Sequence, residues 1–434
     1  MIKLLKKKIE DKNITIGVVG IGYVGLPLSI LFSKKGYKVF CFDTDKKKVK
    51  KINQKKSYLN RISDKEVSLI LKNKGMAFAT FSKIAFCDFI ILCVPTPLKK
   101  NKYPDTSFIQ KTIENIKKYL HESQCIVLES TSYPGTTKDH IYKKIKDQFK
   151  IGENFFIGFS PERINPGENE NSIFNIPKVV SGHTKNCLSI ISTFYSKFFK
   201  RVIKSDSTDK AEFSKLIENI YRSVNISFIN EMKFIADKMN MDIFDIIRLS
   251  KTKPYGFTAF LPGPGIGGHC IPVDPMFLYW KAKRLKINAN FIKLSAETNS
   301  MVINFLIKKI KAELKKININ IKKSKILILG VAYKKNIDDL RESASIKLIN
   351  YFIKKNLIKN IDWYDPEIKG YLKTRSVKFN KKQILLKSEN LKSYDIVVLM
   401  TDHDIFDYKM IYKFSKKIID CRGRYQIDNK VIRG

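Results

Sequence analysis

Short apolar runs alternate with helical patterns along the first third of the chain. Four of the runs predict buried strands, because they are continuous, short and followed by Gly, Pro, Ser or Asp. These runs cover residues 14–19, 38–42, 89–94 and 126–129. A glycine-rich turn at 20–25 follows the first run, and an amphipathic helix then extends to about Lys35. This alternation predicts a parallel sheet with right-handed crossovers.

A different pattern covers residues 206–250, which contain neither Gly nor Pro and are helical in character. Apolar side chains recur there every fourth residue and form one apolar face. They are Leu216, Ile220, Val224, Phe228 and Met232. Such a helix either joins two domains and carries a dimer interface or packs within one domain, and the pattern fits both interpretations. A Gly- and Pro-rich stretch at 254–275 separates it from a second helical region that ends near Lys316.

The alternation of strands and helices then begins again. The predicted strands cover residues 325–330, 361–364, 395–400 and 418–421. The sequence therefore predicts an α/β fold in which a central helical domain joins two doubly wound, Rossmann-like domains. The expected domain boundaries are 1–205, 206–317 and 318–434.

The charge of the chain is strongly positive. Of its 434 residues, 82 are Lys or Arg and 41 are Asp or Glu, which gives a formal net charge of +41. Only 11 of the basic residues are Arg, the side chain that reads phosphates and base edges with a bidentate fork. The lysines are spread over the whole chain, so we expect a solvated basic surface that attracts small anions, and no nucleic-acid partner. A basic nucleic-acid-binding protein is the alternative.

Run lengths and cysteine spacing argue against a membrane protein and a disulfide-stapled secreted protein. The longest apolar runs are too short to span a bilayer. Residues 1–10 contain charges but no apolar stretch with a cleavage site, so we expect a cytoplasmic chain without membrane insertion. The seven cysteines show neither CxxC nor Cys/His metal spacing, which predicts free thiols in a reducing compartment and no metal site.

The turn at residues 20–25 carries the first candidate chemistry. Its sequence, Gly20-Ile21-Gly22-Tyr23-Val24-Gly25, fits GxGxxG between a strand and a helix, the setting in which glycines and a helix N-terminus bind a pyrophosphate. Asp43 ends the second strand, where a carboxylate accepts hydrogen bonds from ribose hydroxyls and favours NAD over NADP. Lys48 lies nearby in the sequence. A structural turn is the alternative, but this combination predicts a dinucleotide site.

The stretch at 262–270 is the most unusual part of the sequence. It places four glycines before Cys270, and a helix-like segment follows at 275–283. Glycine permits close approach to a ligand, and a helix N-terminus favours a thiolate, so Cys270 is a candidate nucleophile. A buried structural cysteine is the alternative. His269 is better explained as a loop histidine with satisfied hydrogen bonds than as a catalytic base.

Four further polar residues are candidates for the site only when they are considered together. Lys215 and Asn219 are four residues apart, so they share one helix face and can together stabilise an oxyanion, although such pairs are common on surfaces. Asp274 follows Cys270 by four residues, and Glu162 lies in a loop after an apolar strand. Taken singly, none of these residues identifies an activity.

The candidate residues belong to a longer series of short motifs. The series covers residues 20–25, 43, 95–97, 130–131, 161–163, 215–219, 267–275, 333–334 and 340–343. In this order the motifs resemble the UDP-glucose/GDP-mannose dehydrogenase family, and the resemblance extends from about Thr15 to Gly423. The cysteine loop is its most specific part, and it looks most similar to the bacterial UDP-N-acetylglucosamine 6-dehydrogenase branch.

The resemblance implies a double oxidation at C6 of a nucleotide sugar, in which a primary alcohol becomes a carboxylate at the expense of two NAD and one water. The Cys270 thiolate would add to the intermediate aldehyde and carry first a thiohemiacetal and then a thioester. Lys215 and Asn219 would stabilise the oxyanions. The residues that would position water and relay protons are Glu162, Asp274 and Thr131.

By the same resemblance, two sets of residues would contact the ligands. The NAD side comprises Gly20, Gly22, Tyr23, Val24, Gly25, Asp43, Lys48, Pro95, Thr96, Ser130, Thr131 and Arg341. The sugar-nucleotide side comprises Glu162, Arg163, Lys215, Asn219, Leu261, Gly265, Gly267 and Lys334. The three predicted domains would bind NAD, form a homodimer with the cysteine loop, and bind the UDP-sugar. The products of such enzymes feed capsule, O-antigen and related surface glycans.

The sequence departs from the family pattern at two places. Many members place an arginine shortly before the glycine loop, where it reaches the partner's substrate, and here the nearest basic residues are Arg248, Lys251 and Lys253. Arg248 is far upstream and the lysines lack a guanidinium fork, so this contact is not carried over. A cofactor-contacting glutamate after Glu162 is also missing from its place, which is held by Pro166 and Gly167 with Glu168 beyond.

Two rival activities share most of these features. UDP-glucose 6-dehydrogenase has the same catalytic set and differs only in how its pocket treats the 2-substituent of the sugar. A two-electron dehydrogenase of the hydroxyacid type shares the fold arrangement but needs no cysteine, so Cys270 argues against it. We therefore expect UDP-GlcNAc, or a close 2-acetamido sugar, as the substrate.

Overall fold

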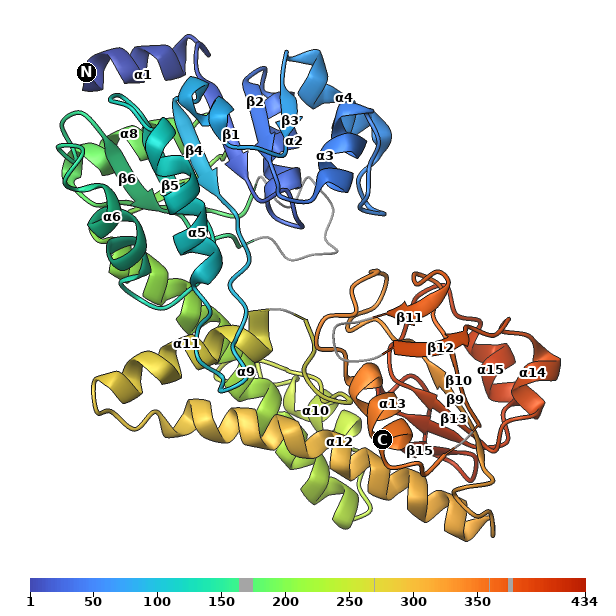
Figure 1. The fold of residues 1–434 in the computed structure, drawn as a ribbon. Coiled ribbons are helices and arrows are strands. Elements are labelled where there is room, and N and C mark those ends of the chain that lie inside the picture. The colour runs from blue at the N-terminus through green and yellow to red at the C-terminus, as the bar shows by residue number, and fades with distance from the viewer. Residues whose placement is uncertain (164–174, 269, 359, 374–377) are drawn as a thin grey trace. The chain divides into compact units, whose positions relative to one another are not determined.

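The computed structural model of the chain describes residues 1–163, 175–268, 270–358, 360–373 and 378–434. These residues form two compact units, each with its own sheet (Figure 1). The first unit comprises Met1–Glu218 and Met276–Ile287, and the second comprises Asn219–Pro275 and Asn288–Gly434. His269, Pro166, Gly167 and Glu168, considered above, lie outside the described residues.

The sheet of the first unit has eight strands in the order β3-β2-β1-β4-β5-β6-β7-β8. Their bounds are β1 Thr15–Val19, β2 Lys38–Phe42, β3 Met76–Phe78, β4 Phe89–Leu92, β5 Cys125–Leu128, β6 Phe156–Phe159, β7 Lys178–Gly182 and β8 Val202–Ser205. The four strands predicted for this part of the sequence are confirmed as β1, β2, β4 and β5. The strand order reverses between β1 and β4, and ligands of such sheets bind beyond the carboxyl ends of the strands at this point.

One pair of strands departs from the predicted parallel arrangement. β6 and β7 are antiparallel, so the prediction of a parallel sheet is wrong for this pair. An antiparallel strand toward one edge is common in otherwise parallel sheets. Because β7 runs back along β6, its first residue, Lys178, lies at the carboxyl end of β6, where Glu162 follows this strand.

Helices cover both faces of this sheet, and alternate strand residues enter separate cores. Ile16 and Val18 of β1 belong to the core on one face, whereas Val19 belongs to the core on the other. The helices of the first face are α1 Ile2–Glu10, α2 Gly25–Lys34, α3 Lys46–Asn53, α4 Asp64–Lys72 and α8 Lys185–Tyr195, and those of the second are α5 Ser107–Ile116 and α6 Lys143–Ile145. This is the doubly wound arrangement that the sequence predicts.

The helix after the glycine turn is more deeply buried than the sequence predicts. α2 begins at Gly25 and ends at Lys34, close to the expected end. Eight of its ten residues are buried, because it packs against β1 and β2 on one side and against α4 on another. The prediction that this helix is amphipathic is therefore wrong.

The second unit contains a five-stranded parallel sheet in the order β10-β9-β13-β14-β15. Its strands are β9 Lys325–Leu329, β10 Asn360–Tyr364, β13 Ile396–Leu399, β14 Ile418–Asp420 and β15 Val431–Arg433. β11 Tyr371–Lys373 and β12 Lys378–Lys382 pair antiparallel in a separate two-stranded sheet. One face is covered by α12 Asn290–Lys316 and α13 Ala344–Lys354, and the other by α14 Ser388–Lys392 and α15 Tyr408–Phe414. The predicted fold class, two Rossmann-like sheets with a helical central region, is confirmed.

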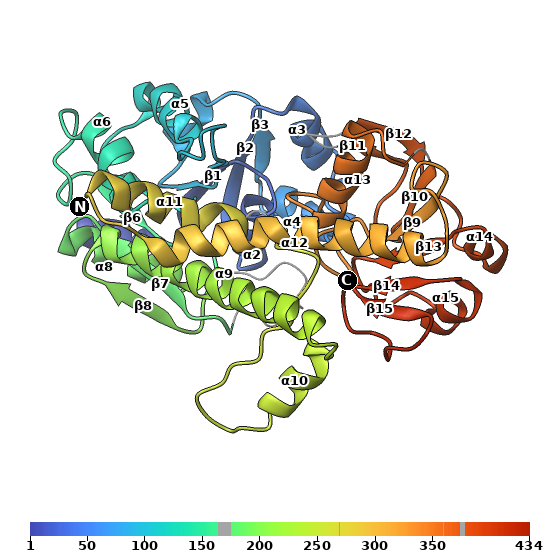
Figure 2. The same cartoon turned by 90° about the horizontal axis from the view of Figure 1, so that it is seen from below.

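The helical region between the two sheets is interrupted. α9 extends from Thr208 to Lys238, and α10 from Ile243 to Ser250 (Figure 2). Asn240 separates them with φ 56°, a left-handed conformation that Asn tolerates better than most residues. α11 then begins at Cys270 and ends at Arg284.

The buried side of α9 differs from the predicted apolar face. Leu216 is buried, but Phe228 is 54% exposed. Ile229 and Ala236 are buried along the second half of the helix, and so are three polar side chains, Ser223, Ser227 and Asn230. They hydrogen-bond to Ser295 and Asn299 of α12, which lies alongside α9 (Figure 2). The prediction is therefore wrong at Phe228, and small polar side chains, which need no apolar surroundings once hydrogen-bonded, also join α9 to α12.

Candidate active site

Steric constraints explain the glycines of the turn between β1 and α2. Gly20 has φ 89°, and a Cβ atom there would lie 2.6 Å from the main-chain oxygen of Cys93. A Cβ atom on Gly25 would lie 2.1 Å from the oxygen of Gly20, so only glycine fits the start of α2. Beyond its chain neighbours, no described atom lies within 4 Å of the corresponding position on Gly22, which leaves room for a bound group beside the main chain.

Asp43 lies beside this turn, at the end of β2. Its Oδ2 accepts a hydrogen bond of 3.2 Å from the N–H of Ile21, and its Oδ1 accepts one of 2.9 Å from the N–H of Asp45. Lys48 Nζ lies 3.1 Å from Oδ2 of Asp43, so the structure brings both predicted residues to the turn. Tyr58, which no sequence motif indicated, donates a hydrogen bond to the carbonyl of Ile21 and holds the turn from the other side.

Hydroxyl groups tie together the loops that follow β4 and β5. Thr96 Oγ1 donates to the carbonyl of Thr131 at 2.6 Å, and Ser130 Oγ donates to the carbonyl of Val94 at 2.7 Å. Thr96 and Ser130 are buried, and Thr131 is half-buried. Because β4 pairs with β1 and β5, these loops and Pro95 lie at the same edge of the sheet as the glycine turn.

Glu162 lies next to a buried ion pair. Lys178 Nζ lies 2.6 Å from Oε2 of Glu129 and 3.8 Å from Oε2 of Glu162. The side chains of Lys178 and Glu129 are 3% and 0% exposed, and the hydroxyl of Tyr195 also donates to Glu129. Burial raises the pKa of Glu129. Burial acts to lower the pKa of Lys178, but the two carboxylates outweigh it and raise that pKa, so Lys178 is a fixed cation behind Glu162.

Arg163, which the resemblance places at the substrate, has protein partners in the first unit. Its Nη2 lies 2.8 Å from Oε1 of Glu218 in α9, and its Nε donates to Oε2 of the same carboxylate at 3.3 Å. Its Nη1 donates to the carbonyl of Pro177 at 3.0 Å. An anionic ligand of Arg163 would therefore compete with Glu218 for the guanidinium group.

Lys215 and Asn219 are one turn apart on α9, as their spacing predicts, and both are buried. Within the second unit, Asn219 Nδ2 donates to Oδ2 of Asp274 at 2.6 Å. Asp274 is 1% exposed and lies one turn beyond Cys270 in α11. The structure therefore brings Asn219 and Asp274 together at the first turns of the helix that Cys270 begins.

The glycine loop before Cys270 packs against the loop that follows β9. Gly268 has φ 85°, and its N–H donates to the carbonyl of Arg341 at 2.9 Å. A Cβ atom on Gly267 would lie 2.5 Å from the Cβ atom of Tyr333, so a larger residue would separate the two loops. Cys270 itself is exposed, as a nucleophile must be.

The remaining predicted ligand residues of the second unit occupy the same two loops. Leu261 is exposed and Gly265 half-buried in the glycine loop, and Lys334 is half-buried in the loop after β9. The guanidinium of Arg341 pairs with both carboxylate oxygens of Asp339, at 2.6 Å between Nη2 and Oδ2. Arg341 belongs to the second unit and the glycine turn to the first, and its contact with NAD stays a prediction.

The second sheet has a carboxylate in the same role as Asp43. Asp365 follows β10, and its Oδ2 accepts hydrogen bonds of 2.7 and 2.8 Å from the N–H groups of Val331 and Ala332. His403 Nε2 lies 3.1 Å from the same oxygen, and the N–H of Asn336 donates to its Nδ1 at 3.1 Å. This pattern assigns the ring proton to Nε2. Asp365 directly follows the strand predicted at residues 361–364.

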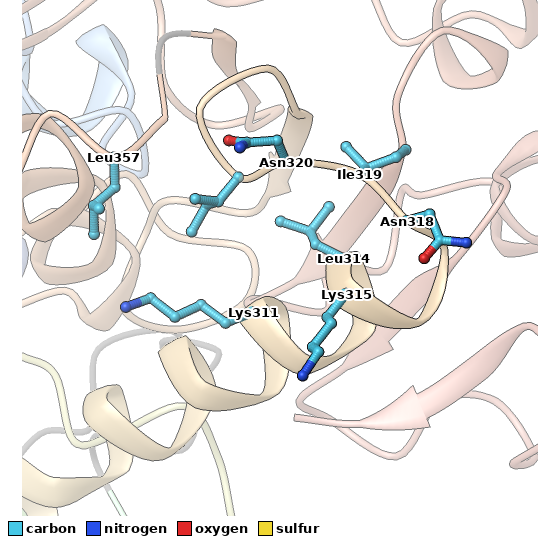
Figure 3. Close-up of a pocket in the computed structure, with 8 residues that line it drawn as sticks. Lys311, Leu314, Lys315, Asn318, Ile319, Asn320 and Leu357 are labelled. Atoms are coloured by element: carbon cyan, nitrogen blue, oxygen red, sulfur yellow. The ribbon is translucent and has the colours of Figure 1, made fainter.

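A cavity of about 470 Å³ lies at the C-terminal end of α12 (Figure 3). It is lined by Lys311, Leu314, Lys315, Asn318, Ile319, Asn320, Ile321 and Leu357. None of the residues predicted to be catalytic or to bind a ligand belongs to this lining. In the described part of the chain, no three His, Cys, Asp or Glu side chains are grouped so as to hold a metal ion.

Sequence models of the UDP-glucose/GDP-mannose dehydrogenase family match the chain in three consecutive parts. The NAD binding domain matches residues 14–199, the central domain residues 209–301, and the UDP binding domain residues 327–429. The chain belongs to this family. The family resemblance inferred from the short motifs is thereby confirmed.

Individual relatives cover nearly the whole chain. Protein CapL of Staphylococcus aureus is 32% identical over 95% of this chain and 96% of its own length. UDP-N-acetyl-D-mannosamine dehydrogenase of Methanocaldococcus jannaschii is 32% identical over 98% and 93%, and UDP-N-acetyl-D-glucosamine 6-dehydrogenase of Pseudomonas aeruginosa is 31% identical over 82% and 83%. The structure of UDP-D-ManNAc dehydrogenase from Pyrococcus horikoshii has a TM-score of 0.84 at 28% identity and covers 95% and 96% of the two chains.

Membership of the UDP-glucose/GDP-mannose dehydrogenase family makes this chain an NAD-dependent nucleotide-sugar dehydrogenase that acts on a CH–OH group of a UDP-sugar. The first unit fits NAD, because the open side of Gly22 and the carboxylate of Asp43 stand where a pyrophosphate and a ribose would meet them. When bound, NAD supplies an acceptor for the hydride that leaves the carbon being oxidised.

Proposed function

We propose that this enzyme carries out a four-electron oxidation at C6 of a UDP-linked 2-acetamido sugar, UDP-GlcNAc or a close relative, and releases the uronic acid. The observation that carries the proposal is the exposed thiol of Cys270, which begins α11 one turn before the buried Asp274–Asn219 pair. An enzyme that stopped at the aldehyde would need no such thiol. Similarity to dehydrogenases of UDP-N-acetyl sugars supports the choice of substrate.

Covalent attachment to Cys270 separates the two oxidations. The C6 alcohol loses a proton and a hydride to give an aldehyde, and the thiolate then forms a C–S bond to its carbonyl carbon. Lys215 and Asn219 stabilise the oxyanion of the resulting thiohemiacetal. Loss of a second hydride gives a thioester, and water cleaves the C–S bond to release the carboxylate and the free thiol.

Three oxygen-bearing side chains handle water and protons in this scheme, namely Glu162, Asp274 and Thr131. Lys178 Nζ lies 3.8 Å from Oε2 of Glu162 and places a positive charge beside that carboxylate. Asn219 orients Asp274 through their 2.6 Å hydrogen bond.

The test is NADH production with a panel of UDP-GlcNAc, UDP-GalNAc, UDP-ManNAc, UDP-glucose and GDP-mannose, with NADH counted against acid formed. We expect two NADH per sugar, with UDP-GlcNAc the best substrate. Two NADH with UDP-glucose as the best substrate would keep the chemistry and overturn the choice of sugar. One NADH per sugar would mean that the reaction stops at the aldehyde, and it would contradict the role proposed for Cys270.

UDP-ManNAc is the second candidate substrate. It is favoured by the similarity to the Methanocaldococcus jannaschii relative and to the Pyrococcus horikoshii structure, both of which are named as dehydrogenases of this sugar. The two candidates differ in configuration at C2 of the sugar, so the panel separates them directly. With either sugar, we propose that the product supplies capsule, O-antigen or related surface glycans.

We further propose that the enzyme is a homodimer joined through α9. This helix carries an exposed apolar ridge, defined as Phe213, Ile217, Tyr221, Phe228 and Ile235, whose members are 39%, 52%, 51%, 54% and 49% exposed. Spacings of four and seven residues place them along one side of the helix. A second copy offers a matching apolar stripe, as a two-fold interface requires. Light scattering that showed a monomer at working concentration would contradict this assembly.

A further inference from the structure

Lys233 of α9 is a buried lysine that meets main-chain oxygens from two distant segments. Its Nζ donates at 3.1 Å to the carbonyl of Gly263, in the glycine loop, and at 2.9 Å to the main-chain oxygen of Gly434. The side chain lies over the ring of Phe305, 5.2 Å from its centre. In the part of the chain that the structure describes, no Asp or Glu lies within ion-pair distance of Lys233, and its hydrogen bonds go to these two main-chain oxygens.

Asn230, one turn earlier on α9, holds the same loop residue. Its Oδ1 accepts a hydrogen bond of 3.1 Å from the N–H of Gly263, and Asn230 is itself buried. α9 therefore binds both the N–H and the carbonyl of one residue in the glycine loop. Arg422 closes the other side, since a Cβ atom on Gly263 would lie 3.1 Å from its Nη1.

The glycine loop is thus fixed at two points. Its first part is held by Lys233 and Asn230 at Gly263, and its last part by the hydrogen bond from Gly268 to the carbonyl of Arg341. Residues between these points lie less deeply, because Gly265, Ile266 and Gly267 are half-buried. A loop fixed at its ends presents its intervening main chain to a ligand without first having to be ordered.

Burying an ammonium group is costly, and an aliphatic side chain would fill the same space. Burial lowers the pKa of Lys233 to about 8, a measure of that cost. Lys309 provides a contrast, because it lies over the same Phe305 ring but pairs with Asp237 and makes no hydrogen bond to the loop. The amine of Lys233 therefore has a task beyond packing.

We propose that Lys233 is a positioning residue that fastens the glycine loop to α9 and to Gly434, so that the loop is ordered before the UDP-sugar binds. This inference rests on the proposed function, in which the loop contacts the sugar nucleotide and ends at Cys270. Lys233 does not touch the reacting atoms. Its contribution is to the affinity for the UDP-sugar, and NAD binding does not depend on it.

The test compares Lys233→Met with the matched control Lys309→Met. Methionine keeps the length and apolar contacts of Lys233 but removes its donors, and it also removes the cost of burying an ammonium group. Amide hydrogen exchange of the peptide spanning residues 261–268 is measured by mass spectrometry on substrate-free protein. The KM values for the UDP-sugar and for NAD are then measured on the same samples.

We expect exchange in the loop peptide to become about tenfold faster in Lys233→Met, the change that loss of one hydrogen bond to a charged group produces. The KM for the UDP-sugar should rise by a similar factor, with the KM for NAD unchanged and with Lys309→Met resembling the wild type. Unchanged loop exchange in folded Lys233→Met, or an equal change in Lys309→Met, would overturn the proposal. If Lys233→Met does not fold, Lys233→Gln is judged by the same exchange criterion. Faster loop exchange in a chain that oxidised no UDP-sugar would retain the positioning role and reject the proposed function.

Discussion

Burial sorts the seven cysteines of the chain into two kinds. Cys270 is exposed at the start of a helix, whereas Cys93 is half-buried and the others are buried. Burial raises the pKa of Cys41 and of Cys421 to about 12, so these thiols stay protonated at neutral pH. Only a thiolate is a strong nucleophile, and exposure at a helix N-terminus makes Cys270 the cysteine suited to this chemistry.

Replacing Cys270 by Ser should abolish acid formation. The weaker nucleophile cannot form the thioester, and we expect the rate of uronic acid release to fall by about a thousandfold or more. Acid is measured by mass spectrometry while NADH is followed by absorbance. The affinity for NAD serves as the control and should stay unchanged, because the glycine turn at residues 20–25, proposed to bind NAD, belongs to the other unit. Full acid production by Cys270→Ser would revive a mechanism without covalent attachment.

The depressed pKa of Lys233 predicts a pH-dependent stability. Unfolded, this lysine binds its proton up to pH about 10.5, and folded only up to about 8, so the unfolded state binds more protons between these values. The free energy of unfolding of the wild type, relative to Lys233→Met, should therefore rise by up to about 3 kcal/mol across this window. Urea unfolding of both proteins at pH 7 and at about pH 10 measures the difference. A difference that stayed constant with pH would contradict the depressed pKa.

Single residues of the site were predicted where a local motif surrounds them. Cys270 follows four glycines and Asp43 ends a strand, and both patterns can be read from adjacent residues. Glu129, Lys178 and Tyr195 form a buried cluster behind Glu162, but they come from three separate elements. No local pattern connects such residues, because only the antiparallel pairing of β6 with β7 brings Lys178 to this position.

At the scale of the elements, α9 carries apolar side chains on two sides. Its inner side buries Leu216, Ile229 and Ala236, together with serines and asparagines that hydrogen-bond to α12. Its outer side carries the exposed apolar ridge, which departs from the rule that apolar side chains of a helix face the inside. A partner that covers the ridge would restore the rule.

A charge on the ridge should dissociate the proposed dimer. Phe228→Glu places a carboxylate in the middle of the apolar stripe, where a two-fold interface would bury two copies of it close together. We expect the mass from light scattering to fall to that of one chain, with the circular dichroism spectrum unchanged. Leu385→Glu, a substitution at an exposed leucine 69% accessible in the second unit, is the matched control and should remain dimeric. A dimeric Phe228→Glu protein would place the interface elsewhere.

Strands buried on both sides were the easiest elements to predict. β1, β4 and β5 are continuous apolar runs with fully or almost fully buried residues, and such runs stand out from their surroundings. α1 and β8 were missed because they bury little, α1 only Leu5 and Ile9 and β8 none of its residues completely. A periodic pattern weakens as the share of buried positions falls, so peripheral elements are the hardest to predict.

At the scale of the whole molecule, two Rossmann-like sheets share one local plan. In each, a carboxylate after the second strand accepts hydrogen bonds from the loop after the first, Asp43 in one unit and Asp365 in the other. The net charge of the chain is +41, and its ligands, the UDP-sugar and NAD, are anionic. The positive charge therefore attracts them to the protein surface. No helix in the described ranges has the length and apolar character needed to cross a bilayer.

This charge should make substrate capture sensitive to salt. Raising KCl from about 20 mM to about 500 mM shortens the Debye length to roughly 4 Å and screens the basic surface. We expect the KM for the UDP-sugar to rise several-fold while kcat stays nearly constant, because screening acts on the approach of the ligand. Steady-state kinetics across the salt series measures both parameters, with sucrose at equal osmolality as the control. A KM independent of salt would show that the net charge has no part in binding.

The two sides of α9 can be edited separately. Hydrogen-bonded serines and asparagines on the inner side fix how α9 and α12 meet, so substitutions confined to the outer ridge leave the architecture of each subunit intact. In the proposed dimer, opposite charges introduced on the ridges of two variants would favour pairing of unlike chains over pairing of like chains. If one chain of such a mixed pair carried Cys270→Ser, the rate of acid formation per intact site would show whether that site depends on the activity of its partner.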